Sequence, residues 1–361
     1  MKTRITLWLA FGAIVFTLHS VSVAQESWEY LMESNRPKNA AEQRAWDLLK
    51  ECRHQGSEGA RKLIAEMLRL PLKYRDKALQ VLALTHTPEA QEYLLWLAVS
   101  ATNTYAAVLY LENNWDLAGA RKLLALRDMS LLVINHFTEH KVPSDAEILK
   151  ETARLLQTDN FIVRGNCAYY LETDSSTNGA RQKVEMLVKS LQSLEQLSGF
   201  TNRMLMAFEV IHVWTEGGHA CRGMINALAD SGGISLELLR ELTPREPGLA
   251  RDCVLVARSW KKDASVKPEL YRIIREQSVG LLRYHAVNSF MRNGALADVP
   301  ELEWVATHDP LFGELDNEGK EQYRAFLRET FRTGAEVPDR IYPIREAALE
   351  TIRRIKSANR N

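Results

Sequence analysis

The sequence lacks a net charge, because its 361 residues include 46 basic and 46 acidic side chains. A protein that binds nucleic acid through the phosphate backbone needs a clear surplus of Lys and Arg, since phosphate contacts supply most of the nonspecific affinity. The balance of charges argues against this class of protein. We therefore expect no nucleic acid among the partners.

Cysteine is scarce. The chain has four cysteines, Cys52, Cys167, Cys221 and Cys253. Their long and unequal spacing matches no small disulfide framework, which excludes a disulfide-stapled miniprotein. Whether any two of them pair stays open at the level of sequence.

Long apolar runs are absent beyond the N-terminus. There, Lys2 and Arg4 precede the apolar or small residues Leu7–Leu18, and the small residues Ser22–Ala24 follow. This order is typical of a secretory signal peptide. The run is shorter than the roughly 20 residues that a membrane-spanning helix needs. We expect a signal peptide at residues 1–24 with cleavage near Ala24, a secreted or periplasmic mature chain, and no membrane insertion after cleavage.

Common catalytic signatures are also missing. The sequence contains no Walker-type phosphate loop, no G-x-S-x-G motif and no dinucleotide fingerprint. No two acidic residues stand out as the carboxylate pair of a glycosidase. We expect no cofactor, and we favour binding over catalysis.

What the sequence does contain is a degenerate repeat. A polar residue, usually Arg, is followed by apolar or small residues three, four and seven positions later, which together form one face of a helix. Clear copies begin at Arg75, Arg164, Arg283 and Arg345, and weaker ones at Thr104, Ser130, Arg203, Arg251 and Arg324. Most intervals between copies suit a helical hairpin. The pattern therefore predicts antiparallel helix pairs.

Helix-start signals occur between the copies. Thr87–Pro88 reads as an N-cap followed by Pro at the first helical position, and Ser144–Glu147 reads as a capping box. Glu216–Gly218 and Ser231–Gly233 read as loops, and no segment alternates strictly in the manner of a strand. We expect an all-α chain, with an N-terminal extension or cap at 25–40 and stacked helix pairs over 41–361.

Two segments resemble a known family. Asp159–Arg164, continued by Ala168 and Leu171, and Asp339–Ile355 are similar to HEAT repeats of the phycobilisome-lyase-like subgroup. The resemblance implies an α-solenoid, an armadillo-type superhelix of stacked helix pairs. It also implies a structural ladder of Asp and Arg side chains, comprising Arg75, Asp159, Arg164, Arg283, Asp339 and Arg345. The family has no common active site, so the resemblance implies no catalytic residues.

One short motif has the spacing of a metal site. His136, Glu139 and His140 fit the H-x-x-E-H pattern, in which two His one helical turn apart bind zinc and a Glu activates the bound water. The neighbouring Val133 and Phe137 fit the packing stripe of the repeat instead, and no motif identifies a third ligand. We therefore expect no metal, and keep a metal-dependent hydrolase as the alternative.

The repeat also predicts a binding surface. Positions five and nine after the repeat Arg point away from the buried stripe, and in a HEAT-like array they line the concave surface. In the copies that begin between Arg164 and Arg283, these two positions supply Tyr169, Phe208, His212, Trp260, Asn288 and Arg292. Aromatic side chains offer a large contact area at low entropic cost and could anchor a peptide or a glycan.

These observations favour an exported interaction scaffold that binds a protein or peptide along its concave face, without catalysis. Two alternatives remain open. One is an extracytoplasmic hydrolase of glycans or peptides, and the other is a structural component of the cell envelope.

Overall fold

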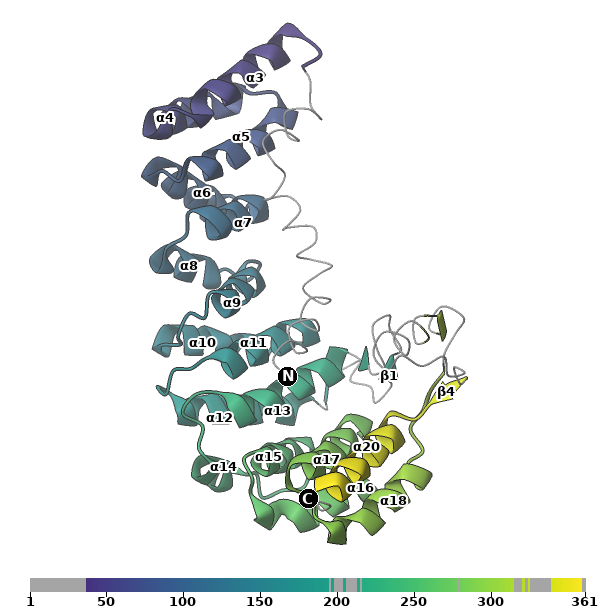
Figure 1. Ribbon diagram of the computed structural model, residues 1–361. Helices are drawn as coiled ribbons and strands as arrows, with labels where there is room; N and C mark the ends of the chain where they lie inside the picture. Colours follow the sequence, from purple (N-terminus) through teal and green to yellow (C-terminus); the bar gives the residue numbers. More distant parts are fainter. Residues whose placement is uncertain are drawn as a thin grey trace. The chain divides into compact units, whose positions relative to one another are not determined.

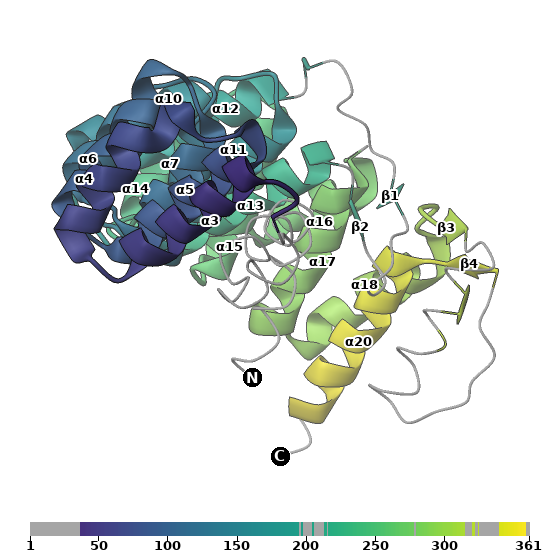
Figure 2. The same ribbon diagram turned by 90° about the horizontal axis from the view of Figure 1, so that it is seen from above.

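The structure is a computed structural model (Figures 1 and 2). It describes residues 37–194, 196–197, 204–205, 213–214, 216–277, 279–314, 320–321, 324 and 339–358. The expected signal peptide and most of the expected N-terminal extension lie outside the described residues. The chain divides into two compact units, Met1–His136 and Phe137–Asn361, and each is described by itself.

Unit 1 is built from helices joined by short turns. Its elements are α3 (Ala40–Arg53), α4 (Gly56–Glu66), the 3-10 helix η1 (Met67–Arg69), α5 (Leu72–Thr85), α6 (Pro88–Ser100), α7 (Thr104–Asn113) and α8 (Leu117–Leu124). Helix α9 (Ser130–Glu139) crosses the boundary between the units.

Unit 2 is helical as well. Its helices are α10 (Ala146–Leu155), α11 (Phe161–Thr173), α12 (Ala180–Leu194), α13 (Glu216–Asp230), α14 (Leu236–Leu242), α15 (Leu249–Trp260), η2 (Ala264–Val266), α16 (Lys267–Glu276), α17 (Gly280–Asn293), η3 (Leu296–Asp298), α18 (Val299–His308) and α20 (Pro343–Ala358). Two antiparallel pairs of two-residue strands accompany them, β1 (Met204–Leu205) with β2 (Val213–Trp214) and β3 (Gly313–Glu314) with β4 (Arg340–Ile341). The all-α prediction is therefore confirmed.

Rows of helices that pack in succession can be followed within each unit. In unit 1, α3, α5 and α7 pack in succession, and so do α4, α6 and α8 (Figure 1). In unit 2 one row consists of α11, α13, α15, α17 and α20, and a second contains α10, α12 and α14. No helix among the described residues is long and apolar enough to cross a membrane.

Apart from the copy on α9, which crosses the unit boundary, the described full-length copies of the sequence repeat fall on a single row in each unit. The described full-length copies lie on α5, α7, α9, α11, α15, α17 and α20. The residues three and four positions after Arg75, Arg164, Arg251 and Arg283 are all buried. After Arg345 the pattern holds only in part, because Ala348 is buried whereas Leu349 is 46% exposed. Helix α20 is the last described element of its row, so no later described helix covers Leu349.

The repeat arginines cap the carbonyl ends of preceding helices. The Nε of Arg75 donates to the carbonyl of Leu70 (3.2 Å), directly after η1. Arg164 Nε donates in the same way to the carbonyl of Thr158 (2.6 Å), just beyond α10. The last carbonyls of a helix have no partner within it, so these bonds satisfy groups that would otherwise be left unpaired.

Two later copies do the same. Arg283 Nη1 donates to the carbonyl of Gln277 (2.7 Å), the C-cap of α16. Arg345 Nε donates to the carbonyl of Asp309 (2.7 Å), the C-cap of α18. In these four copies the repeated Arg has one local task, which is to tie the end of one helix to the start of a later one, whereas Arg251 pairs with Glu269 (2.9 Å).

The ladder of Asp and Arg side chains implied by the family resemblance is not formed by the residues expected to make it. Asp159 influences Arg164 through its charge, but the guanidinium donates to carbonyls and serine hydroxyls instead. Asp339 contacts Lys320. Of the ladder residues, Arg283 forms an Asp–Arg ion pair, with Asp309 at 2.8 Å.

The expected helix starts need two corrections. Thr87 is the N-cap of α6 as predicted, and its hydroxyl accepts from the Ala90 N–H (3.3 Å). The N-cap of α10 is Asp145 rather than Ser144, because Asp145 Oδ1 accepts from the N–H groups of Glu147 and Ile148 (3.0 Å each). Glu216–Gly218 opens helix α13 instead of forming a loop, since packing against neighbouring helices outweighs the weak helix propensity of glycine.

The buried capping arginine yields a first prediction. Arg164 is 1% exposed and donates to Thr158, Ser190 and Ser193. Arg164→Ala leaves these buried acceptors unpaired and should lower the free energy of unfolding by about 3 kcal/mol in urea denaturation. The control is Arg353→Ala, which removes an exposed ion pair and should change it by less than about 0.5 kcal/mol. Equal effects of the two substitutions would contradict the capping role.

Candidate functional site

Four neighbouring helices of unit 2 present a continuous set of polar and aromatic side chains, which we call the polar ledge. Its members are Tyr169 and Glu172 on α11, Arg222, Asn226 and Asp230 on α13, Trp260 and Lys261 at the end of α15, and His285, Asn288 and Arg292 on α17. The helices α11, α13, α15 and α17 contact one another in succession. Hydrogen bonds, ring contacts and charge interactions link most of these residues from helix to helix.

Small residues let α11 and α13 approach closely. A Cβ added to Gly223 would lie 3.2 Å from Ala168 Cβ and 3.4 Å from the Gly165 carbonyl oxygen. A Cβ on Gly165 would lie 3.7 Å from the Ala220 Cα. A larger side chain at Gly223 would therefore push the helices apart. The short separation brings Glu172 on α11 within hydrogen-bonding reach of α13.

The acidic part of the ledge centres on Glu172. Burial raises the pKa of Glu172, and the nearby charge of Asp230 raises it further. Asn226 Nδ2 donates to Glu172 Oε2 (3.3 Å), and this bond together with the charge of Arg222 lowers the pKa only in part. The charged carboxylate is therefore poorly compensated in the absence of a partner.

Lys261 is the basic counterpart. Burial lowers the pKa of Lys261, and the charge of Asp230 opposes this shift. The pKa shifts of Glu172 and Lys261 have the same physical origin, because each group lies partly out of water. Among the described residues, neither group has an ion-pair partner within 4.0 Å. Groups of this kind gain more from a new charged or hydrogen-bonding partner than fully solvated ones.

Trp260 is the main aromatic group of the ledge. Its Nε1 donates to Ser289 Oγ (3.1 Å), and the Arg292 guanidinium lies 5.4 Å from the ring centroid. The ring also meets His285 edge-on, with 5.4 Å between centroids. These contacts come from α17, so they hold the half-buried indole in one orientation.

His285 is a neutral buried histidine. Burial lowers its pKa to about 3, and the charge of Arg222 acts in the same direction. His285 is 4% exposed, and its Nε2 has no hydrogen-bond partner among the described residues. An unsatisfied buried nitrogen lowers stability, and such exceptions are uncommon in folded proteins.

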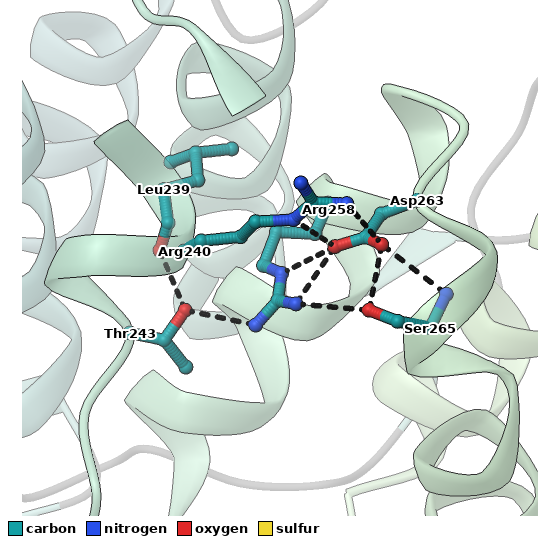
Figure 3. A network of polar contacts seen from close by, with 6 residues as sticks. All are labelled: Leu239, Arg240, Thr243, Arg258, Asp263 and Ser265. Carbon is teal, nitrogen blue, oxygen red and sulfur yellow. Dashed lines mark hydrogen bonds and ion pairs between the residues drawn. The ribbon is translucent and has the colours of Figure 1, made fainter. Parts of the chain in front are cut away.

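A cluster around Asp263, shown in Figure 3, braces the turn that follows the end of α15 at Trp260. Asp263 Oδ1 accepts from Arg240 Nη2 (2.9 Å), and Oδ2 accepts from Arg258 Nη2 (2.7 Å). The hydrogen bond from Arg240 is the largest influence on Asp263, and with the other donors it outweighs burial and holds the pKa well below its usual range.

The same cluster extends beyond the carboxylate. Ser265 Oγ donates to Asp263 Oδ1 (2.7 Å), and Arg258 also donates to Thr243 Oγ1 (3.3 Å) (Figure 3). One carboxylate therefore joins α14, α15 and the start of η2. The bonds brace the short turn that contains Lys262, whose φ of 66° lies in the left-handed region.

The residues predicted from the repeat divide into two groups. Tyr169, Trp260, Asn288 and Arg292 lie on the polar ledge. Burial raises the pKa of the Tyr169 phenol, and Asn288 is half-buried. Phe208 and His212 lie outside the described residues.

Other ledge residues were missed by sequence reasoning. Asn226 and Asp230 lie on α13, which carries no copy of the repeat, so counting from a repeat Arg could not reach them. Glu172 and His285 lie at positions eight and two of their copies, and only the packing of the helices groups them with the ledge. The i, i+4, i+8 spacing of Arg222, Asn226 and Asp230 was the one available signal.

The potential metal motif has a different environment. His136 is buried and its ring meets the Trp115 ring edge-on, with 4.6 Å between the ring centroids. Glu139 and His140 are exposed. Within the part of the chain that the structure describes, no group of three or more His, Cys, Asp or Glu side chains could hold a metal ion.

Glu172 yields a prediction about pH. A raised pKa in the folded state means that the folded chain holds this proton more tightly than the unfolded chain. The free energy of unfolding therefore falls as the pH rises above the pKa of the unfolded state, about 4.3. It stops falling once the pH has passed the pKa of the folded state. Glu172→Gln removes this loss and should stabilise the protein at pH 7, on the order of 1 kcal/mol, with little difference at pH 4.

Urea denaturation at both pH values measures the effect. The matched control is Glu276→Gln, which changes an exposed residue on α16. Its free energy of unfolding should equal that of the wild-type protein at both pH values. A Glu172→Gln variant that is less stable than wild type at pH 7 would show that the carboxylate is better compensated than we infer.

Asp263 yields the opposite pH dependence. Because the pKa of Asp263 is lowered in the folded state, its carboxylate stabilises the fold at pH values above the unfolded-state pKa of about 3.9. This stabilisation is lost as the pH falls through the folded-state pKa. Asp263→Asn should lower the free energy of unfolding by about 3 kcal/mol at pH 7. The difference from wild type should narrow below about pH 4. Asp339→Asn, at an exposed carboxylate, is the control and should leave the denaturation midpoint nearly unchanged.

When the chain is compared with protein-family models, with curated proteins and with solved structures, no match is found in any of the three.

Proposed function

We propose that the protein is an exported α-solenoid of HEAT-like repeats that binds an extended segment of a partner protein along the polar ledge, without catalysis. The observation that carries the proposal is the continuity of the ledge over four neighbouring helices. It combines an oriented indole with a poorly compensated carboxylate and a partly buried amine.

The solenoid part of the proposal rests on the repeat and on the packing. Apart from the copy on α9, the repeat falls on one row of helices within each unit, and such rows are what stacked helical hairpins produce. In a solenoid the helices of one row line an inner surface that grows with every repeat. The residues of the ledge belong to such a row, which suits a long and narrow ligand.

A polypeptide segment fits the chemistry of the ledge. Asn226 and Asn288 can donate to and accept from peptide groups, and the ledge contains charges of both signs. Glu172 and Lys261 are partly desolvated, so charged or hydrogen-bonding groups of a partner would interact with them strongly. The neutral overall charge and the mixed charges of the ledge do not suit a polyanion.

The face of Trp260 also bears on the choice of ligand. Arg292 already lies over the ring, and a sugar that stacked on that face would have to displace it. A peptide can instead approach the edge of the ledge and leave this contact in place. We therefore favour a peptide over a glycan.

The test is a selection of peptides from a display library against the full-length mature chain, followed by calorimetry on the selected sequences. Trp260→Ala and Arg292→Glu should each weaken binding by tenfold or more, which corresponds to about 1.4 kcal/mol. The matched control is Trp304→Ala, which removes a 42% exposed tryptophan from α18, outside the ledge, and should bind as wild type does.

Each outcome has a distinct meaning. Equal loss in the Trp260 and Trp304 variants, with both folded by circular dichroism, would place binding elsewhere. Binding to a glycan array that Trp260→Ala abolishes would replace the peptide with a sugar. A mature chain that selects no peptide and no glycan would favour the structural alternative.

A further inference from the structure

Two of the four cysteines lie side by side. Cys221 on α13 and Cys253 on α15 have their Sγ atoms 3.5 Å apart, and both residues are fully buried. The helices that carry them pack against each other. Cys52 and Cys167 are buried on α3 and α11, and all four are thiols in this structure.

We propose that Cys221 and Cys253 form a disulfide that ties α13 to α15, the two central helices of the polar ledge. A disulfide needs its sulfurs about 2.0 Å apart, so the two atoms have to close by roughly 1.5 Å. Rotation of the two side chains can supply a movement of this size. The sequence separation is long enough that spacing alone did not point to the pair.

The reaction requires an oxidant, and the class we propose is a thiol-exchange disulfide such as oxidised glutathione or an exchange-active protein disulfide. One cysteine loses its proton to solvent, and its thiolate attacks a sulfur of the donor. The donor S–S bond breaks, one donor thiolate leaves, and a mixed disulfide remains. The second cysteine, also deprotonated, attacks the cysteine sulfur of that bond and releases the second donor thiolate. Two electrons pass from the pair to the donor, which ends as two thiols.

Burial determines when the reaction occurs. A donor cannot reach either sulfur while α13 and α15 are packed, so oxidation takes place during folding or during a local opening of the two helices. Once formed, the bond is shielded from reducing thiols in the same way. Disulfides persist in secreted and periplasmic proteins, which is the compartment that the N-terminal residues predict.

The bond would have a structural consequence for the ledge. Asn226 and Asp230 lie on α13, whereas Trp260 and Lys261 lie at the end of α15. A covalent link between these helices limits their relative sliding and restricts the unfolded chain. The pair is independent of what the ledge binds, so a failure of the peptide selection would leave this inference standing.

The experiment uses the full-length mature protein, refolded from urea in a buffer of reduced and oxidised glutathione so that access does not limit the reaction. The product is quenched with acid, unfolded, alkylated and analysed by peptide mass mapping. We expect two alkylated cysteines, Cys52 and Cys167, and one cross-linked peptide pair that contains Cys221 and Cys253. Unfolding and refolding in an excess of reducing agent, which gives the reductant access to the bond, should abolish the cross-link and lower the melting temperature by roughly 5–10 °C.

The control variants are Cys253→Ala and Cys52→Ala. The first should have no cross-link and a melting temperature that does not respond to reductant, and the second should keep both properties of the wild type. Four alkylated cysteines in the refolded wild-type protein would overturn the proposal. Cross-links that involve Cys52 or Cys167 at comparable yield would overturn it as well. The mass map of the unsubstituted chain gives this answer even if a variant fails to fold.

Discussion

The structure depends on one requirement of helical hairpins, which is that the carbonyls at the end of each helix find donors. Arginines of the repeat meet this requirement for Leu70, Thr158, Gln277 and Asp309. Because each guanidinium starts on a later helix, the bond also sets the distance and the angle between two helices. The residues three and four positions further on are then placed in the core. A single interaction therefore satisfies the backbone and determines how consecutive helices pack.

The polar ledge follows from the same arrangement. Once one side of a helix is committed to packing, the residues on the remaining side must face solvent or a partner. On α11, α13, α15 and α17 these residues are neither fully solvated nor fully paired, as Glu172, Lys261 and His285 illustrate. Stability alone would favour apolar or paired side chains there, and this is the physical reason for proposing that the ledge binds a partner.

The sequence was sufficient to predict the all-α class, the helical hairpins and the buried stripe, because these depend on periodicity. The N-cap at Thr87 was predictable for a similar reason, since capping is local. The start of α10 was misplaced by one residue because Ser144 and Asp145 are adjacent and both are good N-cap residues, and the structure uses Asp145.

The site was predictable only in part. Counting from the repeat arginines placed Trp260 and Arg292 on one surface, but it could not include α13, where the repeat is missing. Whether Arg164 pairs with Asp159 or with serines of α12 depends on how far apart the helices lie, and the sequence contains no information on that distance. The proximity of Cys221 and Cys253 is unpredictable for the same reason.

The bracing of the turn after α15 bears on the thermodynamics of recognition. Two arginines, a serine and one carboxylate hold this turn before any ligand arrives. A host that is already ordered loses little conformational entropy on association, so most of that loss falls on the incoming chain. Differences in affinity among ligands would then follow their own stiffness, and a segment already extended in solution, for example by proline, would hold an advantage over a flexible one of the same composition.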